Sequence, residues 1–185
     1  IDLHRINILI GANGSGKSNF ISLFDLLRAI IQNNLQTHIA ECGGANTQFY
    51  LGTKHTKTIS VKIEIDENTY EFKLAADTSD ACSFAEEFVP FCIKRLYPEE
   101  PYIENLGVGH RETRLMESSK YKTVQTFTRE NIKSWFVYHF HDTGDYSPLK
   151  RTADIDEIEY LLPDGGNLAA YLYHLQETAP EHYQG

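Results

Sequence analysis

The chain has 185 residues, 41% of them hydrophobic, and a formal net charge of −9, which suits a single globular domain with a sizeable core. The acidic balance argues against a surface that coats nucleic acid, since phosphate contact needs a basic stripe. No apolar run reaches the roughly 18 residues of a membrane span, and no secretory signal opens the sequence. Three cysteines without CxxC spacing (Cys42, Cys82 and Cys92) argue against a disulfide framework and a zinc knuckle, so we expect a cytoplasmic protein without a membrane partner.

Apolar periodicity predicts the first elements along the chain. Residues 5–10 are predicted to form a short buried strand that leads into a glycine-rich loop. After the loop, apolar residues recur at helical spacing, which predicts a helix from residue 16 to residue 33 or 34. A second helix, 35–42, is expected to end at Gly43-Gly44, where glycine can adopt the left-handed conformation.

The pattern changes to strict alternation at 58–66 and 69–76, with turn residues between, which predicts an antiparallel hairpin. Two more short strands around 82–88 and 90–96 would complete an antiparallel β-subdomain over about 58–96. We expect a loop at 98–119, a helix at 120–134 and a strand at 135–141 (WFVYHFH). Residues 164–166 (DGG) can start a final helix, and Pro180 ends it or begins another turn. The residues expected to share one face of that helix are Leu168, Tyr171, Leu172 and Leu175.

The glycine-rich loop at 11–18, GANGSGKS, fits the pattern G-x-x-x-x-G-K-[ST] at every fixed position. Glycines let backbone N–H groups approach a triphosphate closely, and the following helix adds unpaired N–H groups and the positive end of its dipole. Lys17 can place its ammonium on the β and γ phosphates, and Ser18 can offer a hydroxyl to Mg²⁺. A chance match is expected in on the order of one chain in a hundred. The sequence therefore predicts a site for ATP and Mg²⁺.

The guanine-reading pattern N-K-x-D and the γ-phosphate pattern D-x-x-G are both absent from the sequence, which argues against a GTPase. The variant GANGSGKSN, with asparagine at 13 and 19, resembles the ABC-type ATPases, especially their SMC-like and RecF-like branch. That resemblance implies Lys17 as a catalytic residue and Ser18 as a magnesium ligand. The residues it implies along the phosphates are Asn13, Gly14, Ser15, Gly16, Lys17, Ser18 and Asn19.

A wider resemblance covers most of the chain. The segments ECGGA, LGVGHRET, WFVYHFHDTG and LLPDGGNLAAYLYHLQE, with the glycine loop and its flanks, are similar in kind and order to a family of bacterial predicted AAA/ABC-like ATPases. Relatives of that family occur in anti-phage defence operons, among them Septu-type and retron-associated ATPases. The resemblance implies an α/β fold, a P-loop NTPase with an ABC-like nucleotide-binding domain and an antiparallel β-subdomain. It also implies a homo-oligomer that sandwiches ATP and acts on a partner or effector nuclease.

The catalytic carboxylates of such an ATPase are not found in this sequence. Residues 61–67 (VKIEIDE) alternate and 154–160 (DIDEIEY) are too polar, so neither suits a Walker B strand, and no LSGGQ-like signature is present. We therefore expect 1–185 to be the amino-terminal part of one ABC-like ATPase domain. On this view Walker B, signature and switch residues lie downstream or on a partner. The piece alone should bind nucleotide weakly and hydrolyse almost none.

Two further sets of residues each have more than one interpretation. His139, His141 and Asp142 are polar residues at a strand end or part of a metal site. In a further alternative, His141 or Asp142 senses the γ-phosphate. The sequence DGGN at 164–167 is a capped helix start or a second anion site. The functional hypothesis is a Mg-dependent ATPase module in anti-phage defence. The alternatives are a RecF/SMC-type ATPase of DNA repair or chromosome maintenance, a non-hydrolysing ATP-gated scaffold for an effector nuclease, and an ATPase fused to an OLD-like nuclease. Nucleic acid is a possible partner that the net charge does not support.

Overall fold

The computed structural model describes residues 1–91, 102–115, 117, 122–140, 144, 147–152 and 160–183. The chain divides into two compact units, Ile1–Trp135 and Phe136–Gly185. Each unit is described here by itself. Membership of both in one ABC-like domain stays a prediction.

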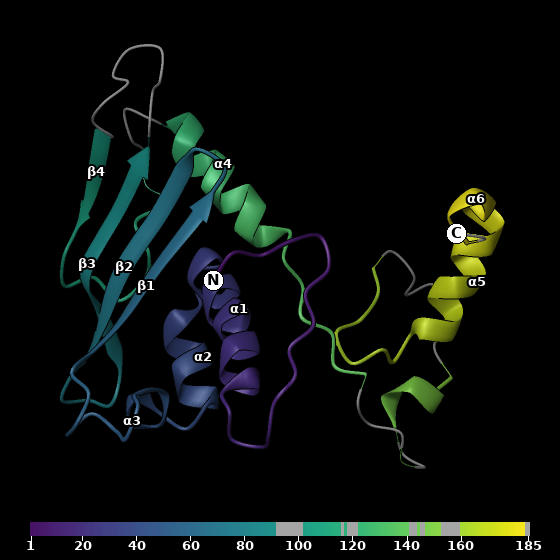
Figure 1. Ribbon diagram of the computed structural model, residues 1–185, viewed down its shortest axis with the longest axis horizontal. Helices are drawn as coiled ribbons and strands as arrows, with labels where there is room; N and C mark the ends of the chain where they lie inside the picture. The colour runs from purple at the N-terminus through teal and green to yellow at the C-terminus, as the bar shows by residue number, and fades with distance from the viewer. Residues whose placement is uncertain are drawn as a thin grey trace. The chain divides into compact units, whose positions relative to one another are not determined.

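The first unit contains a four-stranded antiparallel sheet in the order β1-β2-β3-β4 (Figure 1). Its strands are β1 Thr58–Ile65, β2 Asn68–Ala76, β3 Cys82–Phe91 and β4 Tyr102–Gly107. The predicted hairpin is confirmed, since β1 and β2 pair from Thr58↔Ala75 to Ile65↔Asn68 around a two-residue turn. The sheet follows from alternation: β2 places Tyr70, Phe72 and Leu74 on the buried face.

Two predictions around the sheet were wrong. The expected break between strands at 82–88 and 90–96 does not occur at 89, because β3 continues through Phe91; residues 92–96 lie outside the described part. The expected loop at 98–119 contains β4, which pairs with β3. The segment YIENLG has a weak alternation of its own, so its strand state depends on that pairing and not on local propensity.

Helices that precede the strands in the sequence, and one that follows them, cover the buried face of the sheet. They are α1 Lys17–Ile31, α2 Leu35–Glu41, the short α3 Ala45–Gln48 and α4 Lys122–Lys133, which confirms the helices predicted at 16–34, 35–42 and, in its described part, 120–134. Gly43 and Gly44 have φ angles of 91° and 89°, as expected for the end of α2. One core joins Leu27 and Ile30 of α1, Ile39 of α2 and Ile132 of α4 to the sheet.

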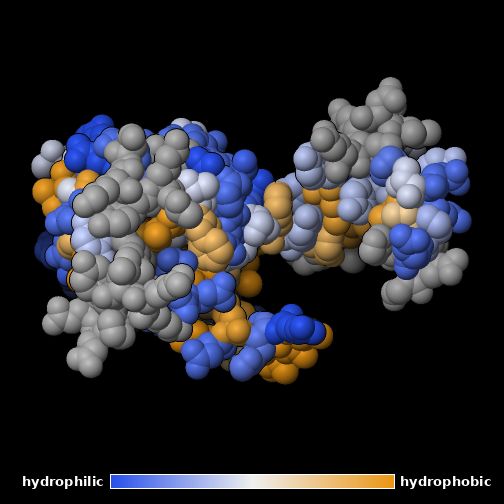
Figure 2. Space-filling view, turned by 90° about the horizontal axis from the view of Figure 1, so that it is seen from above, coloured by the Kyte–Doolittle hydropathy of each residue, from blue (hydrophilic) through white to orange (hydrophobic). Residues whose placement is uncertain are grey.

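The two strands predicted from apolarity alone are not strands. Residues 5–10 make no β-ladder, and Ile6, Ile8 and Ile10 are 82%, 78% and 91% exposed, so the expected buried strand is wrong. Residues 135–140 form no β-strand either, while 141 lies outside the described residues. Apolar sequence favours a strand only where a neighbouring strand supplies hydrogen bonds, and the sheet of the described residues does not extend to either segment. Hydrophobic residues accordingly lie open on the surface (Figure 2).

The second unit contains a short 3₁₀ helix, η1 Pro148–Lys150, and two helices, α5 Leu168–Thr178 and α6 Pro180–Tyr183. The final helix is thus confirmed, although it begins at Leu168. The Asn167 side chain accepts from Leu162 N and donates to Tyr160 O, both at 2.8 Å, which fixes the turn before α5. Leu172, expected to share a face with Leu168, Tyr171 and Leu175, is exposed. Within the described residues, every helix is too short or too polar to cross a bilayer.

Candidate functional site

The glycine-rich loop joins the amino-terminal segment to α1. Gly14 and Gly16 have φ angles of 80° and 90°, which glycine adopts without the steric cost of a Cβ. Ser15 N donates to Ala12 O at 3.2 Å and closes a turn, and Phe20 N donates to Gly16 O at 2.9 Å in the first turn of α1. The N–H groups of residues 17–19 precede the helix's own hydrogen-bond ladder, so this end of α1 has donors to offer.

Lys17 is held by the loop that precedes it. Its Nζ donates to Gly11 O and to Ala12 O, both at 2.7 Å, and lies 3.3 Å from Ser15 Oγ. Gly11 permits this close turn, because a Cβ there would lie 2.7 Å from Ser15 Oγ. The loop therefore curls around its own ammonium group and keeps a positive charge at the amino end of α1, where the helix dipole has the same sign.

Helix α1 is fixed differently along its two halves. Its amino-terminal half is partly exposed and carries Phe20 and Phe24, whose rings lie 5.5 Å apart; Phe24 in turn contacts Trp135 at 5.6 Å, edge to face. Its carboxy-terminal half is buried against the sheet and α2. The glycine loop is thus attached to an anchored helix while the loop itself is open to solvent.

The structure shows contacts elsewhere for two further residues that the sequence analysis considered. The His139 backbone N–H donates to Pro163 O at 2.7 Å within the second unit, whereas His141 and Asp142 lie outside the described residues. Glu64, in the segment rejected as a Walker B strand, pairs with Lys62 at 2.6 Å on the exposed face of β1. Among the described residues no group of three or more His, Cys, Asp and Glu could hold a metal ion.

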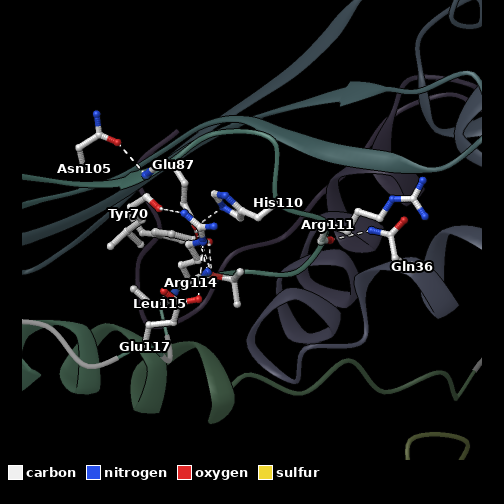
Figure 3. A network of polar contacts seen from close by, with 12 residues as sticks. Gln36, Tyr70, Glu87, Asn105, His110, Arg111, Arg114, Leu115 and Glu117 are labelled. Carbon is white, nitrogen blue, oxygen red and sulfur yellow. Dashed lines mark hydrogen bonds and ion pairs between the residues drawn. The ribbon is translucent and has the colours of Figure 1, made fainter.

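A second polar centre, which the sequence reasoning missed, lies inside the sheet at Glu87. This carboxylate is fully buried. Its Oε1 accepts from Tyr70 OH at 2.6 Å and from the Thr113 hydroxyl, and its Oε2 accepts from Arg114 N at 3.1 Å and contacts His110 Nε2 at 2.7 Å (Figure 3). Four partners around one carboxylate satisfy its oxygens in place of water.

A β-bulge in β3 places Glu87 on the buried face. The β2–β3 register shifts between Lys73 and Leu74, so that Lys73 pairs with Glu86 while Leu74 pairs with Phe84. A bulge reverses the in–out alternation of the strand beyond it, which turns Glu87 inward where strict alternation from Phe84 would point it outward. The adjacent acids EE at 86–87 were the available signal.

His110 completes this cluster from the segment after β4. Its side chain is only 7% exposed, and its ring stacks on Phe84 with centroids 4.8 Å apart. Its Nδ1 is buried and has no hydrogen-bond partner. The ring is thus held by one polar contact and one stacking contact.

The segment 109–114 (GHRETR), here called the strap, ties the sheet to α2. Glu112 accepts from Leu35 N at 2.9 Å and from Gln36 N at 3.1 Å, which caps the amino end of α2. The side-chain amide of Gln36 donates from Nε2 to Arg111 O at 2.7 Å and to Cys82 O at 3.0 Å (Figure 3). Three residues of the strap thus contact the buried carboxylate, and the two between them contact α2: His110, Thr113 and Arg114 for the carboxylate, Arg111 and Glu112 for the helix.

The turn between β2 and β3 joins the strap to the glycines after α2. Asp77 accepts from the Ser79 hydroxyl at 2.6 Å and pairs with Arg111 at 2.7 Å. The hydroxyl contact, with the Ala81 N–H and Arg111, lowers the pKa of Asp77 to about 2. Asp80 O accepts from Ala45 N at 2.9 Å, directly after Gly44. The segments ECGGA and LGVGHRET, far apart in sequence, therefore meet at this turn.

Residues 6–160 match the model of a protein family described as "AAA domain, putative AbiEii toxin, Type IV TA system". Neither the curated proteins nor the solved structures gave a match. The matched range includes the glycine loop, the antiparallel sheet and the strap. Because it spans most of the chain, the chain belongs to this family of AAA domains, and it is a nucleotide-binding, ATPase-like P-loop module of α/β class.

Proposed function

We propose that the chain binds Mg·ATP at the loop of residues 11–18. The observation that favours this most is the position of Lys17, whose ammonium is held by two loop carbonyls at the amino end of α1. Cation, helix dipole and unpaired N–H groups then converge on one place, which is what a chain of phosphates requires. The residues proposed to line the phosphates are Asn13, Gly14, Ser15, Gly16, Lys17, Ser18 and Asn19.

The residues present fit the nucleotide and its metal. A Cβ at Gly14 or Gly16 would meet no atom within 4 Å, so open space lies beside both residues. Lys17 would exchange its carbonyl partners for phosphate oxygens, a stronger charge-assisted contact. Ser18, exposed in the first turn of α1, would supply a hydroxyl to Mg²⁺, which when bound neutralises charge on the β and γ phosphates.

Hydrolysis is the further step of the proposal. Lys17 would stabilise charge that develops on the γ-phosphate, as cations do in phosphoryl transfer. Activation of the attacking water needs carboxylates that the sequence does not supply in Walker B form, so turnover by these 185 residues should be far below that of a complete ATPase. We propose that an ATP-sandwiched dimer of the ABC type, in its SMC-like or RecF-like form, provides the complete site.

The biological setting proposed is bacterial anti-phage defence. The family description names a putative toxin of a Type IV toxin–antitoxin system, which supports a role in which nucleotide state gates a harmful effector. A DNA-repair or chromosome-maintenance ATPase and a non-hydrolysing scaffold for an effector nuclease are the competing functions. A degenerate active site that binds ATP without turnover would favour the scaffold.

The proposal is tested by calorimetric titration of ATP with Mg²⁺ and with EDTA. Lys17→Ala should weaken ATP binding at least about tenfold, or about 1.4 kcal/mol, and Ser18→Ala should reduce the gain from Mg²⁺. Lys62→Ala, which removes an exposed lysine from β1, is the matched control and should bind as the wild type does. Equal affinity of the Lys17→Ala variant and the wild type would contradict the proposal.

A further inference from the structure

The loop between α3 and β1, residues 50–57 (YLGTKHTK), presents large apolar and basic side chains together. Tyr50 and Leu51 are 78% and 68% exposed. Lys54, His55 and Lys57 follow them and are also exposed. We call residues 50–57 the basic loop. Adjacent exposed apolar residues beside a group of cations are typical of a contact surface and not of a solvated turn.

The basic loop is rigidly built. Gly52 N donates to Phe49 O at 2.8 Å, and Gly52 O accepts from both His55 N and Thr56 N at 3.1 and 3.0 Å. The Asn46 side chain accepts from Thr53 N at 3.0 Å and from the Thr53 hydroxyl at 3.1 Å. Phe49, directly before the loop, is buried in the core. The exposed side chains are therefore presented on a fixed backbone, which reduces the ordering cost of binding.

Backbone strain at the tip supports a functional purpose. Leu51 has a φ angle of 56° and Gly52 one of 80°, so two consecutive residues are left-handed, one of them a bulky non-glycine residue. Such a conformation persists only where surrounding contacts hold it, and it concentrates at binding sites. Gly52 cannot be replaced freely, because a Cβ there would lie 2.8 Å from Asn46 Oδ1.

The segment that contains the loop has a charge opposite to that of the whole chain. Residues 42–63 contain no Asp or Glu, although 26 of the 185 residues are acidic and a stretch of 22 would hold about three on average. The outward face of β1 continues from the loop with the exposed hydroxyl residues Thr58 and Ser60. It ends at Lys62, which Glu64 neutralises at 2.6 Å. The positive region is thus local and short.

We propose that the basic loop binds a short stretch of single-stranded nucleic acid. Tyr50 would stack on one base, and Lys54, Lys57 and, when protonated, His55 would contact the neighbouring phosphates; Thr58 and Ser60 extend the path with hydroxyl donors. Stacking on an exposed ring beside a few cations suits a flexible single strand. A duplex would bring many phosphates against a chain of net charge −9, so only a short strand fits.

The test is fluorescence anisotropy of a labelled oligothymidylate of about 12 nucleotides at about 50 and 200 mM salt. Tyr50→Ala should weaken binding at least about tenfold while Tyr50→Phe stays within about twofold, because the ring and not the hydroxyl stacks. Lys54→Ala with Lys57→Ala should weaken binding and flatten its logarithmic salt slope by about 1.4. Tyr173→Ala and Lys133→Ala, exposed residues elsewhere, are matched controls and should bind as the wild type does.

Further measurements distinguish binding of a single strand at this loop from binding at the ATP site and from general attraction of polyanions. Lys17→Ala should bind the oligonucleotide normally, so failure of the proposed ATP site and failure of this proposal remain separate results. The proposal is overturned if Tyr50→Ala binds as the wild type does, or if Lys17→Ala abolishes binding. Equal or tighter binding of duplex DNA, of an oligoglutamate peptide or of vesicles with about 30% phosphatidylglycerol would also overturn it, since each would replace base stacking by charge alone.

Discussion

The phenol hydroxyl of Tyr70 donates to Glu87 Oε1 at 2.6 Å, and both side chains are fully buried. A carboxylate in such a place is stable only while its donors remain, because desolvation of the charge is otherwise uncompensated. Glu87→Ala would in turn leave Tyr70, His110 and Thr113 without their shared acceptor. We expect this variant to lose about 3–5 kcal/mol of unfolding free energy, measured by urea denaturation.

Two matched variants test whether the loss of stability comes from the buried contacts of Glu87 or from the loss of any carboxylate charge. Glu87→Gln keeps one acceptor but turns an NH₂ group toward donors, so a smaller loss of about 1–3 kcal/mol is expected. Glu86→Ala removes the neighbouring, half-exposed carboxylate that pairs with Lys73 at 2.8 Å, and should cost about 1 kcal/mol or less. Equal losses for Glu86→Ala and Glu87→Ala would show that the buried contacts are not what stabilises this strand.

Tyr70 should make the fold sensitive to alkali. Burial, and then the Glu87 charge, raise the pKa of Tyr70 well above 10. Above pH 10 the unfolded chain ionises this phenol while the folded chain keeps it protonated, so stability is present below pH 10 and falls as the pH rises, by up to about 1.4 kcal/mol per pH unit. Tyr70→Phe, though less stable at pH 7, should show a shallower decline between pH 10 and 11 in urea denaturation. Parallel curves for the two proteins would contradict this.

Sequence patterns predicted the parts of the fold that local periodicity decides. Helix α1, with its apolar stripe through Leu27 and Ile30, and the β1–β2 hairpin, with its strict alternation, formed where expected. The strand predicted at 5–10 failed because a strand depends on a neighbour, which sequence alone does not show. Residues 102–107 were predicted to lie in a loop but form a strand, since pairing with β3 overrides a weak local pattern.

Of the two polar centres described above, the sequence also predicted one and missed the other. The loop at 11–18 could be identified because its residue types and spacing are set by local backbone chemistry. The cluster at Glu87 could not, because a register shift in β3 determines which face the carboxylate occupies, and its partner His110 lies 23 residues away in sequence. A bulge leaves no fixed sequence signature. Similarity flagged LGVGHRET as a segment, but only the folded contacts show its role as the strap.

Asp77 should contribute to stability in mild acid. The Ser79 hydroxyl, the Ala81 N–H and Arg111 lower its pKa from an ordinary 3.8 to about 2. A lowered folded pKa means that the contribution is present above about pH 4 and is lost as the pH falls toward 2. The urea midpoint of the wild type should therefore drop more between pH 5 and 2.5 than that of Asp77→Asn. Asp66→Asn, in the exposed β1–β2 turn, is the control and should follow the wild type.

Glu112 should stabilise α2 from outside the helix. Its two oxygens accept from Leu35 N and Gln36 N, which satisfies donors that a helix start leaves open and complements its dipole. Glu112→Ala should cost about 1–2 kcal/mol, and Glu112→Gln less, because an amide oxygen still accepts. Hydrogen exchange should show faster exchange of the Leu35 and Gln36 amides in the alanine variant. Glu117→Ala, an exposed neighbour 3.6 Å from Arg114, should leave those amides unchanged.

Gly43 and Gly44 provide a matched pair that tests the junction between α2 and the β2–β3 turn. Both have φ angles near 90°, so alanine at either position costs at least about 1–2 kcal/mol of backbone strain. Gly44, with ψ 170°, lies in a region that essentially only glycine adopts, so its strain is the larger. At Gly43 the added Cβ would lie 3.3 Å from Thr47 Cγ2, whereas at Gly44 it would lie 2.0 Å from Asp80 Oδ2. Gly44→Ala must therefore also displace Asp80, whose carboxylate accepts from Asn46 N at 2.9 Å.

We expect Gly44→Ala to be less stable than Gly43→Ala by at least about 1 kcal/mol in urea denaturation. The double variant Gly44→Ala with Asp80→Ala relieves the collision, so the added cost of alanine at Gly44 should shrink toward that at Gly43. If the two single variants were equally stable, Asp80 would have moved aside freely, and the turn would not hold the ECGGA segment. A persistent difference in the Asp80→Ala background would likewise assign the cost to backbone strain at Gly44 and not to the contact.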